Sequence, residues 1–146
     1  MSRFTYSIRI NAPPERVFDV LTDLQRIPEW HAGVGIKDVT GPLGVGTALT
    51  LTGTMLGRKQ EHRRTITQFE RPGLFAMEGP GGGILARLEP TADGTDLVTE
   101  ERFAMPLGPV GEWATEHLFK RMAMSEIDKS LRSLKALVEA EVPARV

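Results

Sequence analysis

Between Gly33 and Met105 the chain is a succession of short strand-like segments separated by tight turns, with no helical segment between them. Gly57, Asp93-Gly94 and the glycine-rich run 79–83 are among the turn signals that divide this region. Consecutive strands joined by short turns pair as an antiparallel meander, whereas a parallel sheet needs a long crossover, usually a helix, between paired strands. The region therefore predicts an antiparallel sheet and excludes a doubly wound α/β fold.

The N-terminal segment predicts one further strand and two short helices. Apolar and polar residues alternate from Arg3 to Ile10, which is typical of a half-buried strand. Asn11 stands where a helix N-cap belongs, and two prolines follow in the expected first turn. A second helical turn is expected after Thr22, ending at Pro28.

After Pro109 the hydrophobic period changes from two residues to three and four, which predicts an amphipathic helix. One apolar stripe runs for about 30 residues to near Glu141, and Pro143 ends it. Such a helix is long enough to cross a small domain. The stripe consists of Val110, Trp113, His117, Met124, Ile127, Leu131, Leu134 and Val138.

Composition excludes several classes of function and cellular location. The 146 residues suit one domain spanning 1–146, and a net charge of −1 gives no electrostatic reason to expect nucleic acid as a partner. The basic cluster from Arg58 to Arg64, interrupted by Glu61, is interpreted as a solvated strand face. Cysteine is absent, and no apolar stretch is long enough for membrane insertion, so we expect a cytoplasmic protein.

The order strand, two short helices, meander and long helix resembles the START-like (Bet v 1-like, SRPBCC) superfamily, and in particular its bacterial polyketide cyclase/dehydrase branch. The segments that carry the resemblance are 8–18, 21–30, Phe69-Glu70-Arg71-Pro72, Leu88-Glu89-Pro90 with Gly94-Thr95, and the terminal helix. It implies an α+β helix-grip fold, in which a curved antiparallel sheet of about seven strands wraps around the C-terminal helix. It also implies an elongated cavity between the sheet and that helix, where a small hydrophobic molecule would bind.

His117 and Glu101 are the candidate catalytic residues. His117 lies on the apolar stripe and is expected to point toward the sheet, where an imidazole can orient a ligand or move a proton near neutral pH. Glu101 shares its strand face with Leu97 and Phe103 and is expected to be buried, paired with Arg64 or Arg121. For His117 the alternatives are a buried histidine hydrogen-bonded to a strand and a histidine in water at the mouth of the fold. For Glu101 the alternative is an ion pair that only holds the structure.

Other candidate ligand-binding residues are aromatic, methionine or cationic side chains expected near the cavity. Methionine fills adaptable apolar cavities but also ordinary cores, and Trp30 can equally be a core residue. No histidine spacing typical of a metal site occurs, so neither a metal nor another cofactor is expected. The set is Trp30, His31, Met55, Met77, Phe103, Trp113, Arg121 and Met124.

Three functions remain open from the sequence. The first is binding of a lipid-like, polyketide-like or aromatic molecule by a monomer or homodimer. The second is a polyketide-type cyclase, aromatase or dehydratase that uses His117 with Glu101 or Arg121. The third is a protein–protein module such as a chaperone co-factor, which an exposed apolar patch would favour.

Overall fold

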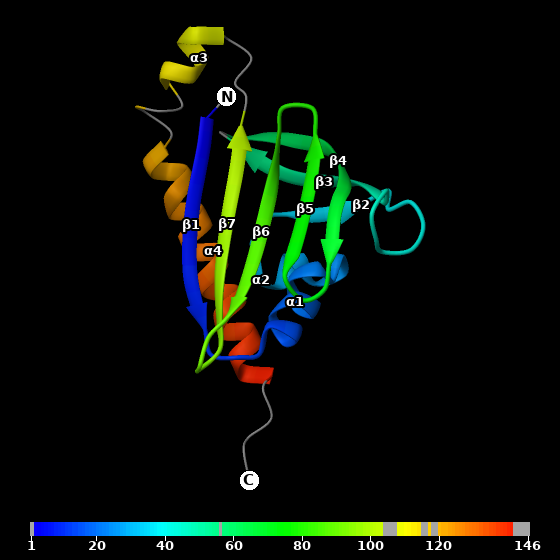
Figure 1. Cartoon of the computed structure of the whole chain (residues 1–146). Coiled ribbons are helices and arrows are strands. Elements are labelled where there is room, and N and C mark those ends of the chain that lie inside the picture. The colour runs from blue at the N-terminus through cyan, green and yellow to red at the C-terminus, as the bar shows by residue number, and fades with distance from the viewer. Residues whose placement is uncertain (1, 56, 104–107, 115–116, 118–119, 142–146) are drawn as a thin grey trace.

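The computed structural model describes residues 2–55, 57–103, 108–114, 117 and 120–141. It consists of a curved sheet with a long helix lying along one of its faces and short helices closing one end (Figure 1).

Seven strands form one antiparallel sheet in the order β1-β7-β6-β5-β4-β3-β2. Apart from the pair β1 and β7, neighbouring strands are consecutive in sequence, which confirms the predicted meander. Strand β1 pairs with β7 along its whole length, from Ser2 opposite Phe103 to Ile10 opposite Thr95. The strands are β1 (Ser2–Ile10), β2 (Gly35–Lys37), β3 (Ala48–Met55), β4 (Arg58–Glu70), β5 (Leu74–Gly79), β6 (Gly82–Pro90) and β7 (Thr95–Phe103).

The helices lie at the two ends of the chain, as the sequence predicts. They are α1 (Pro14–Thr22), the 3-10 turn η1 (Leu24–Arg26), α2 (Ile27–Trp30), α3 (Gly108–Ala114) and α4 (Lys120–Glu141). Among the described residues, no helix is both long enough and apolar enough to cross a membrane.

Helix α4 runs alongside β1 and in the same direction. The Tyr6 hydroxyl donates a hydrogen bond to Asp128, and farther along Lys135 Nζ donates to the backbone oxygen of Arg9 at 2.9 Å. The N-terminal half of α4 therefore lies near the beginning of β1, and its C-terminal half lies near Ile10.

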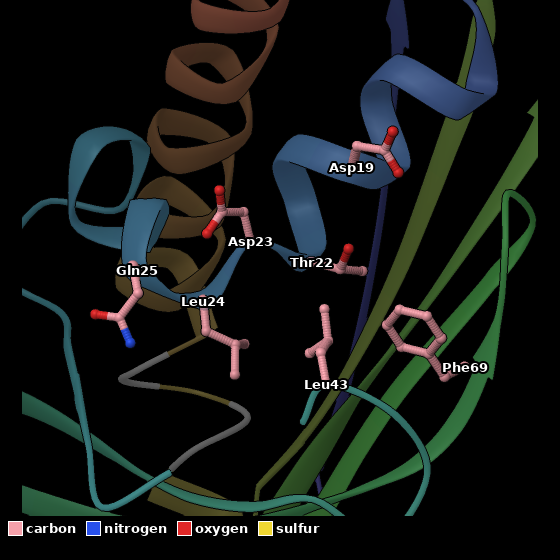
Figure 2. A pocket seen from close by; sticks show the side chains of 7 residues that line it. All are labelled: Asp19, Thr22, Asp23, Leu24, Gln25, Leu43 and Phe69. Atoms are coloured by element: carbon pink, nitrogen blue, oxygen red, sulfur yellow. The ribbon is translucent and has the colours of Figure 1, made fainter. Parts of the chain in front are cut away.

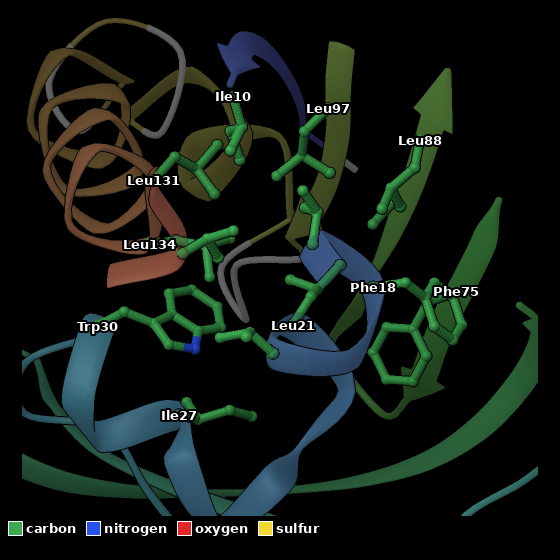
Figure 3. Packing of buried hydrophobic residues seen from close by; sticks show 14 of the residues in the cluster. Ile10, Phe18, Leu21, Ile27, Trp30, Phe75, Leu88, Leu97, Leu131 and Leu134 are labelled. Atoms are coloured by element: carbon green, nitrogen blue, oxygen red, sulfur yellow. The ribbon is translucent and has the colours of Figure 1, made fainter. Parts of the chain in front are cut away.

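The hydrophobic core joins the sheet to α1 and to the C-terminal half of α4 (Figure 3). Leu131 and Leu134 of α4 point toward Ile10 and Leu97 of the sheet. Leu134 and Leu97 are both 0% exposed, and burial of such side chains stabilises the fold by about 2 kcal/mol each.

Three local expectations are wrong. Pro13, not Asn11, is the N-cap of α1, and Pro28 lies in the first turn of α2, where its missing N–H costs nothing. The apolar stripe, expected to pack along the whole of a helix of about 30 residues, is buried from Ile127 onward in α4 but is exposed at Trp113 in α3. Val110 in α3 is exposed, so packing against the sheet does not hold that part of the stripe.

Candidate functional site

The inner face of the sheet is the face on which α4 lies. Its two ends differ in how completely their side chains are buried. Inward-facing residues are alternate residues of each strand, and near Ile10 they are buried, as Leu88 and Leu97 show. At the other end, near the start of β1, Phe4 is 3% exposed, but several other inward-facing side chains remain half-buried. We call this second region the open end of the inner face; its half-buried members are Ile84, Glu101, Phe103, Leu51 and His62.

Helix α4 shows the same gradient along its apolar stripe. From Ile127 onward the stripe is tightly packed, since Ile127 is 7% exposed and Val138 is 0% exposed. Met124, the stripe residue nearest the start of α4, is half-buried. The packing of the stripe is therefore less complete toward the open end, where inward-facing side chains are still reached by solvent.

Glu101 is the acidic residue of the open end. The β-sheet register places it between Phe4 of β1 and Ile84 of β6, so its neighbours on both sides are apolar. Burial raises the pKa of its carboxyl to about 7, from an ordinary value of 4.5. Such a group holds a proton at mildly acidic pH and exchanges it near neutrality, as a general acid or base requires.

The expected partners of Glu101 are not found beside it. Within the described part of the chain, no ion pair joins Glu101 to Arg64 or Arg121, and Arg121 is exposed. Burial alone accounts for the raised pKa of Glu101. Glu101 is therefore an acidic group that forms no ion pair with a cation among the described residues.

Arg64 of β4 also faces inward, which corrects the interpretation of the basic cluster as wholly solvated. Arg58, Lys59 and Arg63 are exposed, but Arg64 is only 9% exposed. Strand parity explains this difference, because Arg64 is two residues from Ile66, which is 0% exposed on the inner face.

The guanidinium of Arg64 is held by backbone carbonyls. Its Nη1 donates to the oxygen of Arg63 at 2.8 Å and to the oxygen of Pro80, in the β5–β6 turn, at 3.2 Å. Burial lowers the pKa of Arg64, and burial followed by the charge of Arg64 lowers the pKa of His62. His62 is therefore neutral at physiological pH, and Arg64, whose ordinary pKa is far higher, keeps its charge.

Trp30 and His31 lie at the C-terminal end of α2. Trp30 is 8% exposed and packs in the core beside Ile27 (Figure 3). The indole Nε1 of Trp30 and the ring Nδ1 of His31 are both buried without a hydrogen-bond partner among the described residues. Burial lowers the pKa of His31, so its ring is neutral near pH 7.

The structure places the other candidate catalytic residue, His117, on the surface. His117 is exposed, its Nδ1 lies 2.9 Å from the backbone oxygen of Trp113, and its ring stacks on the Trp113 indole at 4.9 Å between centroids. Trp113 itself is 56% exposed. The side chain of His117 thus does not take the expected orientation toward the sheet, and within the described residues no hydrogen bond joins it to Glu101.

The remaining candidates divide between the core and the open end. Met77 is buried beside Ile84, and the Phe103 ring packs against Phe4 with 5.6 Å between centroids. The side chain of Met55 lies outside the described residues. Met77, Phe103 and the half-buried Met124 therefore supply apolar surface facing the same region.

A separate open pocket of about 440 Å³ lies between the end of α1, η1, the β2–β3 loop and β4 (Figure 2). It contains none of the candidate catalytic or ligand-binding residues, and its Asp19 is paired with Arg71. Its lining consists of Asp19, Thr22, Asp23, Leu24, Gln25, Leu43 and Phe69. Among described residues, no group of three acidic or histidine side chains could hold a metal ion.

Comparison with solved structures identifies the same fold in other proteins. TTHA0849 from Thermus thermophilus is 19% identical over 97% of this chain and 100% of its own, with a TM-score of 0.79. The polyketide-cyclase-like protein Cgl2372 from Corynebacterium glutamicum is 25% identical over 95% of this chain and 92% of its own, with a TM-score of 0.63. Ara h 8.0201 is 15% identical over 96% and 99% of the two chains, with a TM-score of 0.67.

Sequence comparison assigns the family. No curated protein matches the chain significantly. The family described as "Polyketide cyclase / dehydrase and lipid transport" matches residues 1–139. Together with the helix-grip fold shared with Ara h 8.0201, this match shows that the chain belongs to the polyketide cyclase/dehydrase and lipid transport family of the SRPBCC, or Bet v 1-like, superfamily.

Proposed function

We propose that the chain binds a small, largely apolar molecule between the open end of the inner face and the N-terminal half of α4. The observation that supports this proposal is the half-exposed state of Ile84, Leu51 and Phe103, which face the helix and yet are reached by solvent. Large apolar side chains facing inward are normally covered, so a hydrophobic occupant would gain free energy by covering them.

The chemistry of the site fits this kind of occupant. Apolar side chains dominate the lining, and Glu101, Arg64 and His62 are the few polar groups. Small-molecule sites generally combine an apolar wall with a small number of polar groups that fix orientation. Membership of a family described by lipid transport supports the same class of ligand.

Blocking the open end tests the proposal. The neutral fluorophore N-phenyl-1-naphthylamine serves as the apolar probe, and its binding is followed by fluorescence titration. Ile84→Trp places an indole in the open end, whereas Leu85→Trp makes the same kind of change at the next residue, whose side chain points to the outer face. Both positions are half-buried, so both variants should fold.

We expect the wild type and Leu85→Trp to bind the probe with the same affinity. Ile84→Trp should bind it about tenfold more weakly or not at all, since a loss of about 1.4 kcal/mol of binding free energy lowers the affinity tenfold. Equal binding by all three proteins would contradict the proposed location. Absence of binding to the wild type would contradict the proposed function itself.

Proton-transfer catalysis is a second candidate, and the pKa of Glu101 favours it. A carboxyl with a pKa of about 7 can donate a proton in a cyclisation or dehydration near neutral pH. Glu101→Gln would then abolish turnover of a polyketide-type substrate while leaving binding of N-phenyl-1-naphthylamine intact. Unchanged turnover in this variant would exclude Glu101 as the acid.

A further inference from the structure

Arg64 is a buried cation for which the described part of the structure shows no counter-charge. It is 9% exposed, and its two hydrogen bonds, both from Nη1, go to backbone oxygens of Arg63 and Pro80. Glu78, the nearest acidic residue by sheet register, is opposite Thr65 on the outer face and pairs with Arg102. A buried charge without an opposite charge is costly, and this cost falls when an anion binds beside it.

The geometry of the guanidinium leaves one binding edge free. Arginine has five N–H donors, and Nη1 accounts for both hydrogen bonds found among the described residues. The edge formed by Nε and Nη2 can bind the two oxygens of a carboxylate or a similar oxyanion side by side. The carbonyl contacts fix the plane of the guanidinium in advance, so little side-chain entropy is lost when an anion binds.

The surroundings of Arg64 favour an anion with an apolar body. In the sheet Arg64 is opposite Leu49, which is 0% exposed. Gly79 lies close to the guanidinium and has no side chain; a Cβ added to it would lie 3.1 Å from Arg64 Nη1. His62, the next inward residue of β4, has a lowered pKa and is neutral. The positive charge on this part of the inner face therefore comes from the Arg64 guanidinium.

We propose that Arg64 anchors the anionic group of the bound molecule, and that the ligand is therefore an apolar acid. This inference rests on the proposed function, because it assigns the chemistry of one end of the same ligand. The apolar body lies against the open end of the inner face, and its carboxylate, sulfonate or phosphate group meets the free edge of the Arg64 guanidinium.

A matched pair of probes tests this inference. 1-Anilinonaphthalene-8-sulfonate and N-phenyl-1-naphthylamine share one aromatic body, and only the first has an anionic group. Arg64→Gln removes the charge and leaves a neutral amide near the position of the arginine Nε. Arg63→Gln is the control, since Arg63 is the exposed neighbour on the outer face and bonds Thr50. Arg64→Lys keeps the charge and loses the planar fork.

We expect Arg64→Gln to weaken sulfonate binding at least tenfold, the change that corresponds to one charge-assisted hydrogen bond. Binding of the neutral probe should change less than about twofold, Arg64→Lys should be intermediate, and Arg63→Gln should match the wild type. If Arg64→Gln does not fold, the comparison of Arg64→Lys with the wild type decides.

Two results would overturn the inference. Equal weakening of both probes, or no weakening of the sulfonate, would show that Arg64 only ties the β5–β6 turn to β4; the proposed function would then stand, provided that the wild type binds the neutral probe. If the wild type binds neither probe, both the inference and the proposed function fail.

Discussion

The raised pKa of Glu101 makes the stability of the protein depend on pH in a way that one substitution should remove. In the unfolded chain this carboxyl has an ordinary pKa near 4.5, and in the folded protein burial raises the pKa to about 7. Below pH 4.5 the carboxyl is protonated in both the folded and the unfolded state, so this group does not lower the stability of the folded protein. Between pH 4.5 and about 7 the unfolded chain loses its proton first, and stability falls as pH rises.

The size of this effect follows from the two pKa values. One pH unit corresponds to about 1.4 kcal/mol, so the free energy of unfolding should fall by about 3 kcal/mol between pH 4.5 and pH 7 on account of this group. Glu101→Gln replaces the carboxyl by a neutral group of the same shape, and we expect its advantage over the wild type to grow with pH and to reach about 3 kcal/mol at pH 8.

Urea unfolding at pH 5, 6, 7 and 8, followed by tryptophan fluorescence, measures this difference. Glu100→Gln is the matched control, because Glu100 is the adjacent residue on the outer face and pairs with Arg3 at 3.2 Å. Its stability relative to the wild type should not rise with pH. A difference between Glu101→Gln and the wild type that stays constant from pH 5 to pH 8 would refute the assignment of Glu101 to an apolar environment.

Two further predictions concern the packing that holds the site. Leu134→Ala should lower the free energy of unfolding by about 2–5 kcal/mol because the side chain is 0% exposed. Met122→Ala, on the exposed side of the same helix, should change it by less than about 0.5 kcal/mol. Urea unfolding measures both, and equal effects would contradict the packing of α4 on the sheet through the Leu134 face. Gly79→Ala should lower the free energy of unfolding by more than about 2 kcal/mol, since its Cβ would lie 2.0 Å from the backbone oxygen of Arg63. Gly44→Ala is the control, because a Cβ there meets nothing within 4 Å. Thermal unfolding that does not distinguish the two variants would show that the strands separate easily at this turn.

The part of the fold predicted best from the sequence depends on local patterns. The alternation from Arg3 to Ile10, the turn signals of the meander and the stripe from Ile127 to Val138 all appear as expected. In each case the side chains that alternate or recur in sequence are buried on one face, so local periodicity and global packing agree. The exposure of Val110 and Trp113 is harder to predict, since the apolar period continues through α3.

The candidate site was predicted only in part. Glu101 was expected to face inward because it shares parity with Leu97 and Phe103, and this expectation is confirmed by the register with Phe4. The same reasoning applied to β4 would have identified Arg64 as an inward residue, since Ile66 is two positions away. The many charged residues near Arg64 in the sequence instead favoured the interpretation of the whole segment as solvent-exposed.

The sequence by itself determined the order of the elements, the antiparallel meander and the apolar faces, because these depend on hydrophobic period and on turn residues within a few positions of each other. Only the tertiary structure decided that Arg64 is enclosed and that His117 is exposed. The exposure of a side chain depends on which distant element covers it, and the covering of the sheet by α4 ends partway along the helix. Local periodicity marks the face to which a residue belongs, and long-range packing decides whether that face is covered.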